Sequence, residues 1–334
     1  MVINIETRKV QQTGGSSFII SLPKEWIEKH KIKPKDTLGI LSQPDGNLLI
    51  TPYINSEEFV KSKIFDVDHI TDSNYLFRIL IGMYIMGYTV ITIKSSKKFK
   101  PFIRDTISNF TQIAIGPEVI EESNNIIIIK DLLNPKEMPF EKTIRRMYVL
   151  AQDMHENAIK ALNSGDKTLA EEVIKRDDEV DRLHWLIGRQ SHIVLRDIIL
   201  CQKMGITLED ISHFQSISRF LERISDHSVK IAKNVLLIDF HKIEKKILSD
   251  LSKASIFSLK MLDVSLDAWL NKDLNLANEN INSVKELIDT CENINFRLDK
   301  FPEFSVPIGY IIESIRRTGE YSVDISEVII NKLI

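Results

Sequence analysis

The spacing of apolar and polar residues predicts a small β-rich module at the start of the chain. Up to about residue 52, short apolar runs at 18–22, 38–41 and 48–50 are separated by turn residues, and each run predicts a strand. Pro-Asp-Gly-Asn at 44–47 is typical of a hairpin turn between the last two strands. Pro23 suits the first turn of a short helix. So small a piece buries little surface alone, so we expect it to need a partner.

The next segment, residues 57–135, alternates between helical and strand-like patterns. Helices are predicted at 75–87 and 100–110, and β-structure at 89–93, 112–121 and 125–130. This alternation predicts a small α/β domain. The segment carries neither a phosphate-binding glycine loop nor a nucleophile motif.

From residue 139 onward the apolar positions follow a helical period, as at Ile217, Leu221 and Ile224. Breaks at 163–166, 204–207, 241 and 301–303 predict long helices of the kind that pack in bundles. Residues 224–231 and 318–325 are alike, which indicates an internal repeat. We therefore predict a first domain at 1–52, an α/β domain at 57–135, and two three-helix repeats at 140–240 and 245–334.

Composition narrows the possible functions. The 334 residues carry a net charge of -3, which excludes a generally cationic nucleic-acid binder and leaves only a local basic patch. The two cysteines, Cys201 and Cys291, lie far apart and predict buried thiols in a reducing compartment. Neither a leader nor a sufficiently long apolar span is visible, so we expect a cytoplasmic protein without membrane insertion. Without a nucleophile–base set, we expect no catalytic site and no enzyme.

The stretch RKVQQTGGSSFIISLPKEW at 8–26, continued by IKPKDTL at 32–38, resembles the SpoVT/AbrB swapped-hairpin family. This resemblance implies an AbrB-like β-barrel in which two chains exchange hairpins, and therefore a DNA-binding homodimer. Glu6, Glu25 and Glu28 offset much of the positive charge, so a dimerising module that binds a protein instead of DNA remains the alternative. The residues expected to contact DNA are Arg8, Lys9, Gln11, Thr13, Ser16, Ser17 and Lys24.

Two pairs of carboxylates predict a cation site in the bundle. Glu222 and Asp226 are four residues apart and share a helix face, and Asp177 and Asp181 repeat the spacing on another helix. Such pairs on neighbouring helices would form an oxygen-rich site for a hard or borderline cation. A solvated acidic face is the alternative interpretation.

LERISDHSVKIA at 221–232 and DEVD at 178–181 resemble the motifs of the PhoU family. The resemblance implies two three-helix repeats that carry metal clusters, and a role in restraining phosphate uptake. It implies a divalent or trivalent ion, with Mg, Zn, Mn or Fe as candidates. The expected ligands are Asp177, Asp178, Asp181, Glu222 and Asp226.

The second repeat departs from this pattern. Arg316 stands where the first repeat has Glu222, and Glu320 replaces Asp226. A cation at position 316 would oppose a metal ion and suits an ion pair with Glu320 one helical turn away. We therefore expect at most one good metal cluster, in the first repeat.

Together these features predict a transcriptional regulator of phosphate homeostasis with a metal-binding helical sensor. The first alternative is an adaptor without DNA-binding activity that contacts a phosphate transporter or a sensor kinase. The second is a metal-dependent hydrolase, which the lack of a base or nucleophile beside the carboxylates disfavours.

Overall fold

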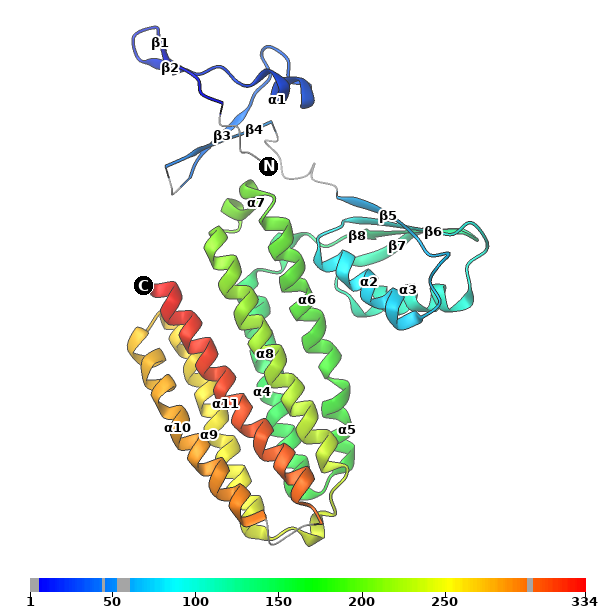
Figure 1. Ribbon diagram of the computed structural model, residues 1–334, viewed down its shortest axis with the longest axis vertical. Coiled ribbons are helices and arrows are strands. Elements are labelled where there is room, and N and C mark those ends of the chain that lie inside the picture. Colours follow the sequence, from blue (N-terminus) through cyan, green and yellow to red (C-terminus); the bar gives the residue numbers. More distant parts are fainter. Residues whose placement is uncertain (1–5, 44–45, 53–60, 299–302) are drawn as a thin grey trace. The chain divides into compact units, whose positions relative to one another are not determined.

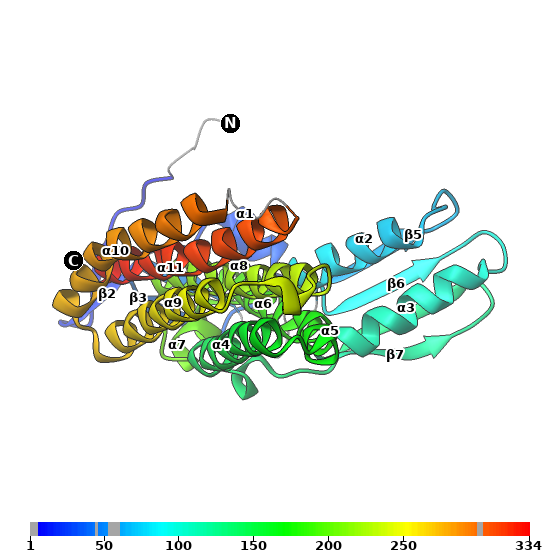
Figure 2. The ribbon, with the colours of Figure 1, turned by 90° about the horizontal axis from the view of Figure 1, so that it is seen from below.

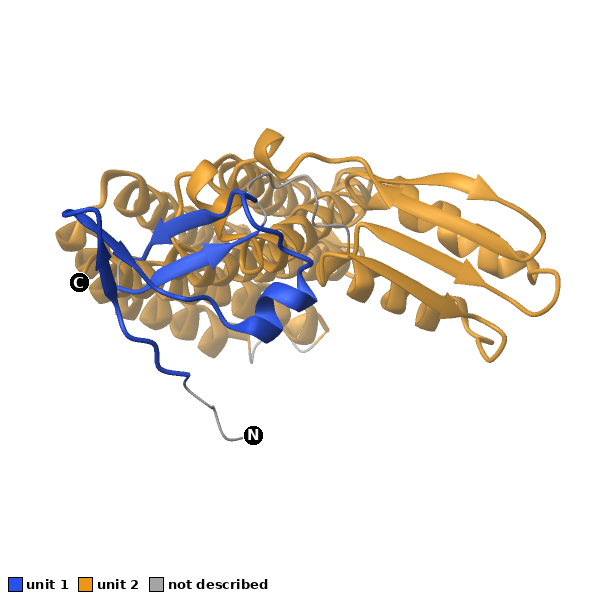
Figure 3. Ribbon diagram, turned by 90° about the horizontal axis from the view of Figure 1, so that it is seen from above, with its two compact units in different colours: residues 1–59 blue, residues 60–334 orange. Residues whose placement is uncertain are grey.

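The chain forms two compact units, residues 1–59 and 60–334, shown in blue and orange in Figure 3. The computed structural model describes residues 6–43, 46–52, 61–298 and 303–334. Pro44 and Asp45 of the predicted hairpin turn lie outside the described residues. Each unit is described by itself.

Unit 1 consists of two antiparallel hairpins with a short helix between them. Gly14 and Gly15, with φ of +62° and +84°, form the turn of the first hairpin, a backbone conformation that side chains with a Cβ disfavour. The predicted pairing of the last two strands is confirmed, with Ser42 opposite Leu48. The elements are β1 (Gln11–Thr13), β2 (Ser17–Ile19), α1 (Lys24–Lys29), β3 (Gly39–Ser42) and β4 (Leu48–Thr51).

The strand predicted at 18–22 ends at Ile19, because no described strand pairs with residues 20–22. Pro23 stands just before α1, as its N-cap, instead of in its first turn. No described side chain of unit 1 is buried: Phe18 is 72% exposed, Ile40 66% and Leu48 65%. A single copy therefore has no core here.

The α/β part of unit 2 is a four-stranded sheet in the order β5-β6-β8-β7, with β5 and β6 parallel and the other neighbours antiparallel. Two helices cover one face of the sheet (Figures 2 and 3), where Ile91, Ile93, Ile127 and Ile129 are buried. The elements are β5 (Ser62–Asp66), α2 (Ser73–Ile85), β6 (Val90–Lys94), α3 (Pro101–Ile113), β7 (Pro117–Glu122) and β8 (Ile126–Asp131).

Two features of this part differ from the sequence prediction. Residues 112 and 113 end helix α3, and the following strand begins only at Pro117. Strand β5 was not predicted, because it lies at the sheet edge with Ile64 62% exposed and lacks the apolar alternation of a half-buried strand.

The remaining chain is a bundle of long helices (Figure 1). In the first repeat the middle helix is divided at Arg176 into α5 and α6. Its helices are α4 (Phe140–Ser164), α5 (Lys167–Lys175), α6 (Asp177–Val194), α7 (Ile198–Lys203) and α8 (Leu208–Val235). The second repeat contains α9 (Lys245–Asn271), α10 (Leu274–Leu298) and α11 (Ser305–Leu333). Single-turn 3-10 helices occur at η2 (Pro135–Glu137) and η3 (Phe240–Lys242).

The predicted fold class, a β-rich N-terminal region followed by an α/β unit and a helical bundle, is confirmed. Cys201 and Cys291 are free and buried, as predicted. Among the described residues, no helix is long and apolar enough to cross a membrane.

Both repeats share one hydrophobic core, and a buried histidine links their helices. His155 of α4 is fully buried, with its Nε2 2.9 Å from Ser255 Oγ on α9 and its Nδ1 3.3 Å from Thr318 Oγ1 on α11. Burial lowers the pKa of His155 to about 4, so the imidazole is neutral at physiological pH. The two repeats therefore pack as one body.

A buried ion pair joins the α/β part to the bundle. Arg189 of α6 pairs with Asp131 at the end of β8, and their side chains are only 1% and 6% exposed. The same guanidinium donates to the carbonyl oxygens of Tyr84, at 2.8 Å, and Tyr88, at 3.0 Å. All of these partners lie on the α/β part, so Arg189 fixes α6 against it.

Candidate functional site

Helices α6 and α8 bring the predicted carboxylates together. Asp177 and Asp181 lie one turn apart on α6, and Glu222 and Asp226 lie one turn apart on the adjacent α8. These four side chains, called here the α6–α8 carboxylate cluster, are partly buried, whereas Asp178 is exposed.

The carboxylates repel one another in a partly desolvated place. Burial, followed by repulsion from Asp177, Glu222 and Asp226, raises the pKa of Asp181 to about 7. Burial together with Asp226 and Asp178 raises the pKa of Asp177 to about 6. Burial also raises the pKa of Glu222 and of Asp226. The negative charge of this cluster is therefore poorly compensated at neutral pH.

The nearby basic side chains neutralise only part of the cluster. Arg223 lies 3.7 Å from a carboxylate oxygen of Glu222 and 3.7 Å from one of Asp226. Within the described ranges, neither Asp177 nor Asp181 forms an ion pair. A cation at the cluster would supply the missing positive charge.

The donor set suits a hard cation, because all four groups of the cluster offer carboxylate oxygens. In the part of the chain that the structure describes, no three Asp, Glu, His or Cys side chains stand together as a preformed metal shell. His184 does not join the set: its Nδ1 lies 3.1 Å from Ser218 Oγ, and burial lowers its pKa to about 4. The oxygen donors of the cluster suit such an ion in kind, but as they stand they do not form its coordination shell.

At the corresponding place in the second repeat, the side chain of Arg316 supplies the positive charge. Arg316 Nη1 lies 2.6 Å from Glu320 Oε1, so the predicted ion pair is confirmed. Arg316 also donates to both oxygens of Glu313, and Arg317 binds the other oxygen of Glu320 at 2.6 Å. Glu313 and Glu320 are thus paired with arginines of the same helix, in contrast to the α6–α8 carboxylate cluster.

The predicted DNA-contacting residues are all exposed, and the first six lie on or beside one hairpin. Gln11 and Thr13 of β1 pair with Ile19 and Ser17 of β2, so their side chains share one face of the hairpin. Phe18 lies on the opposite face, opposite Gln12. The hairpin therefore has one face rich in polar groups.

Two of the basic side chains that were predicted to contact DNA form weak surface ion pairs. Arg8 pairs with Glu6, and Lys24, the first residue of α1, lies 3.7 Å from Glu28. Exposed pairs of this kind contribute little and exchange readily for another anion. Lys24 belongs to the helix and not to the hairpin, so the structure groups six of the seven residues on or beside one hairpin.

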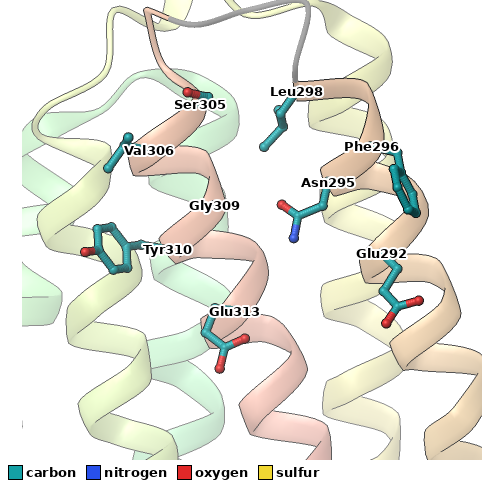
Figure 4. Close-up of a pocket in the computed structure, with 9 residues that line it drawn as sticks. All are labelled: Glu292, Asn295, Phe296, Leu298, Ser305, Val306, Gly309, Tyr310 and Glu313. Carbon is teal, nitrogen blue, oxygen red and sulfur yellow. The ribbon is translucent and has the colours of Figure 1, made fainter.

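A separate groove of about 800 Å³ lies between the end of α10 and the start of α11 (Figure 4). Asn295 and Leu298 point toward α11, whereas Phe296 projects away from the gap. None of the predicted site residues lines this groove.

Sequence reasoning missed a second group of residues, the lysines Lys136, Lys142 and Lys203, which line one pocket. They come from three elements and are as much as 67 positions apart. They form no sequence motif, so only the fold reveals their proximity.

Two family models match segments of the chain. Residues 144–235, which include all five predicted metal ligands, match the family model of the PhoU domain. This segment of the chain is similar to a PhoU domain. Residues 11–58 match the model described as antidote-toxin recognition MazE, bacterial antitoxin. The first of these matches lies within unit 2 and the second within unit 1.

Curated relatives of the PhoU domain are phosphate-specific transport system accessory proteins. The homologue 1 of Thermotoga maritima is 26% identical over 40% of this chain and 56% of its own length. The homologue of Rhizobium meliloti is 26% identical over 56% of this chain and 81% of its own length. The chain thus spans little more than half the length of the first of these relatives.

Two solved PhoU structures are also similar. PhoU from Pseudomonas aeruginosa is 20% identical, with a TM-score of 0.47, and the match covers 58% of this chain and 95% of that one. The phosphate transport system regulatory protein PhoU from Streptococcus pneumoniae is 22% identical, with a TM-score of 0.48, over 57% and 91% of the two chains.

Proposed function

We propose that this protein is a dimeric, DNA-binding regulator of phosphate uptake whose PhoU domain binds a metal ion. One observation supports the proposal above all: the same chain contains a segment that matches the PhoU domain and a hairpin unit that matches the MazE model. None of the described side chains of the hairpin unit is buried. The relatives of the PhoU domain are accessory proteins of phosphate-specific transport systems, so phosphate uptake is the process that we propose this protein regulates.

Dimerisation follows from the lack of a core in unit 1. Phe18 and Ile40 are 72% and 66% exposed in a single copy, and large apolar side chains in so small a unit need a covering surface. A second copy provides that surface when hairpins are exchanged, in the manner of the SpoVT/AbrB family. The exchange joins two basic hairpins into one symmetrical unit.

DNA binding uses the polar face of this paired unit. Arg8 and Lys9 contact phosphates, and Gln11, Thr13, Ser16 and Ser17 lie where side chains would reach base edges, with Lys24 as a further phosphate contact. Residues 1–52 contain seven Lys and Arg residues and five Asp and Glu residues, so the attraction is local and sensitive to salt.

The metal ion is held by Asp177, Asp181, Glu222 and Asp226, with exposed Asp178 at the edge of the cluster. When bound, the ion supplies positive charge that joins α6 to α8. Without it, the carboxylates repel across the same interface. The two states therefore differ in how firmly α6 and α8 associate, and such a difference can bias a conformational equilibrium.

An adaptor without DNA-binding activity is the second candidate. It is favoured by the names of the relatives, which are transport accessory proteins, and by Glu6 and Glu28, which pair with Arg8 and Lys24. In that case unit 1 only dimerises, and the partner is a phosphate transporter or a sensor kinase.

Replacing Arg8 and Lys9 together by glutamine is expected to weaken binding to the protein's own upstream DNA at least about tenfold, because interactions with phosphates dominate such affinities. The slope of log affinity against log salt is expected to fall by about 0.9 for every phosphate that the variant no longer neutralises. Fluorescence anisotropy at four salt concentrations measures both quantities.

The matched control replaces Lys97 and Lys98, two adjacent exposed lysines of the α/β part, by glutamine. It removes the same charge and is expected to leave the slope unchanged. Equal slopes for the native protein and the Arg8/Lys9 variant would contradict DNA binding by these residues and would favour the adaptor function instead.

A further inference from the structure

A pocket of about 390 Å³ lies where the start of α4 meets the turn between α7 and α8. None of its residues belongs to the α6–α8 carboxylate cluster or to the hairpin. Its walls carry lysines and one glutamate, and its floor is apolar. The lining residues used below are Lys136, Lys142, Lys203, Glu141, Met204 and Phe214.

The lysines give this pocket a positive charge that the protein leaves uncompensated. Lys136 is in η2, Lys142 in the first turn of α4 and Lys203 at the end of α7. All three are exposed, and none of their ammonium groups forms an ion pair or hydrogen bond within the described parts of the chain. Three lysines and one glutamate, Glu141, thus line the pocket, and this excess of positive charge favours an anionic ligand.

The segments that carry these lysines are held in place by buried groups. Gln190, which is 1% exposed, donates from Nε2 to the carbonyl oxygens of Pro135, at 3.1 Å, and Met138, at 2.7 Å. These two residues flank Lys136. On the other wall, Cys201 Sγ donates to the carbonyl oxygen of Ile206 at 3.0 Å and holds the turn after Lys203. The backbone around the pocket is therefore preformed, which lowers the entropic cost of binding.

The floor is suited to an apolar group. Pro139, Met204 and Ile206 are the partly exposed apolar residues of the lining, and they lie beside the buried rings of Phe140 and Phe214, which stack with their centroids 4.9 Å apart. A fourth cation, Lys332, is held by Asp210 at 2.7 Å, with its Nζ 5.4 Å from the centroid of the Phe214 ring. A ligand with an anionic end and a flat or aliphatic portion would use both kinds of surface.

We propose that this pocket binds a phosphorylated small molecule of about nucleotide size, with the phosphoryl oxygens on Lys136, Lys142 and Lys203 and the organic portion on the apolar floor. A phosphoryl group offers several anionic oxygens, which matches three separate ammonium groups better than a single carboxylate does. The volume falls within the range of small-molecule sites and exceeds the need of a lone phosphate ion.

Isothermal titration calorimetry of the full chain, in chelator and without DNA, tests this proposal. The probes are ADP, inorganic phosphate and adenosine. We expect ADP to bind more tightly than inorganic phosphate and adenosine to show no binding. Lys142→Gln and Lys203→Gln are each expected to weaken ADP binding about tenfold, the effect of losing one charge-assisted hydrogen bond.

Lys246→Gln is the matched control, because Lys246 is an exposed lysine in the first turn of another long helix, α9. It is expected to leave the affinity for ADP unchanged. Equal affinities of ADP for the native protein and both pocket variants would overturn the proposal, as would a failure of ADP to bind. Equal affinities for ADP and inorganic phosphate would contradict the role of the apolar floor. Because neither metal nor DNA is present, the result is separable from the test of the proposed function.

Discussion

Replacing Arg189 by methionine is expected to lower the free energy of unfolding by about 3–5 kcal/mol, the usual loss when one partner of a buried ion pair is removed. The substitution leaves the Asp131 carboxylate, 6% exposed, without its guanidinium. It also removes the donor to the carbonyl oxygens of Tyr84 and Tyr88. Urea denaturation followed by circular dichroism measures the loss.

Arg196→Met is the control for this prediction. Arg196 also donates to a carbonyl oxygen at the end of α2, that of Met86 at 3.0 Å, but from an exposed position. We expect it to change the free energy of unfolding by less than about 1 kcal/mol.

The double variant Arg189→Met with Asp131→Leu is expected to recover the part of the loss that comes from the unpaired carboxylate. A loss below about 1 kcal/mol for Arg189→Met would contradict the role assigned to this pair.

Asp181→Asn is expected to weaken metal binding at least about a hundredfold, because even residues that only orient metal ligands affect affinity by about 10- to 100-fold. Asp181 lies at the centre of the α6–α8 carboxylate cluster, since it interacts with Asp177, Glu222 and Asp226. Calorimetric titration with Mg²⁺, Mn²⁺, Zn²⁺ and Fe³⁺ identifies the ion and measures the loss. Asp105→Asn, at an exposed position on α3, is the control and is expected to bind as the native protein does.

The same variant distinguishes the removal of a metal ligand from damage to the fold. The raised pKa values of Asp177, about 6, and Asp181, about 7, mean that the folded protein binds protons more tightly than the unfolded chain does. The stability of the metal-free protein therefore falls as the pH rises from about 4 through 7. Asp181→Asn removes one of the repelling charges, so its melting temperature in excess chelator at pH 8 should exceed that of the native protein. A lower melting temperature would show that Asp181 is a structural group.

The sequence was sufficient for features that depend on local spacing. The i,i+4 carboxylates predicted one face of α6 and one of α8, because helical periodicity alone puts such residues together. In the second repeat Arg316 stands at the position that Glu222 has in the first, and this difference predicted an ion pair between Arg316 and Glu320. The distance of 2.6 Å between Arg316 Nη1 and Glu320 Oε1 confirms the prediction.

Features that depend on contacts between distant segments were not predictable. Arg189 meets Asp131 across 58 positions, and nothing in the local pattern distinguishes this arginine from an exposed one. His155 meets Thr318 across 163 positions. The three lysines of the pocket are ordinary surface residues in their own helices, and strand β5 was missed because an exposed edge strand has little apolar alternation.

The two repeats differ in how their carboxylates are paired. In the second repeat Arg316 and Arg317 neutralise Glu320 and Glu313 permanently. In the first repeat the charge of Asp177 and Asp181 remains to be compensated. Occupancy by a cation would therefore change the association of α6 with α8 while α11 keeps its own ion pairs.

The most direct test is a gel shift with the protein's own upstream DNA. It compares the full chain with a chain that lacks residues 1–52, at 50 and 200 mM salt, with metal and with chelator. The account predicts salt-sensitive retardation by the full chain, a different affinity in chelator, and no retardation by the truncated chain although circular dichroism shows its helices intact. Retardation by the truncated chain, or none by the full chain under any of these conditions, would contradict it.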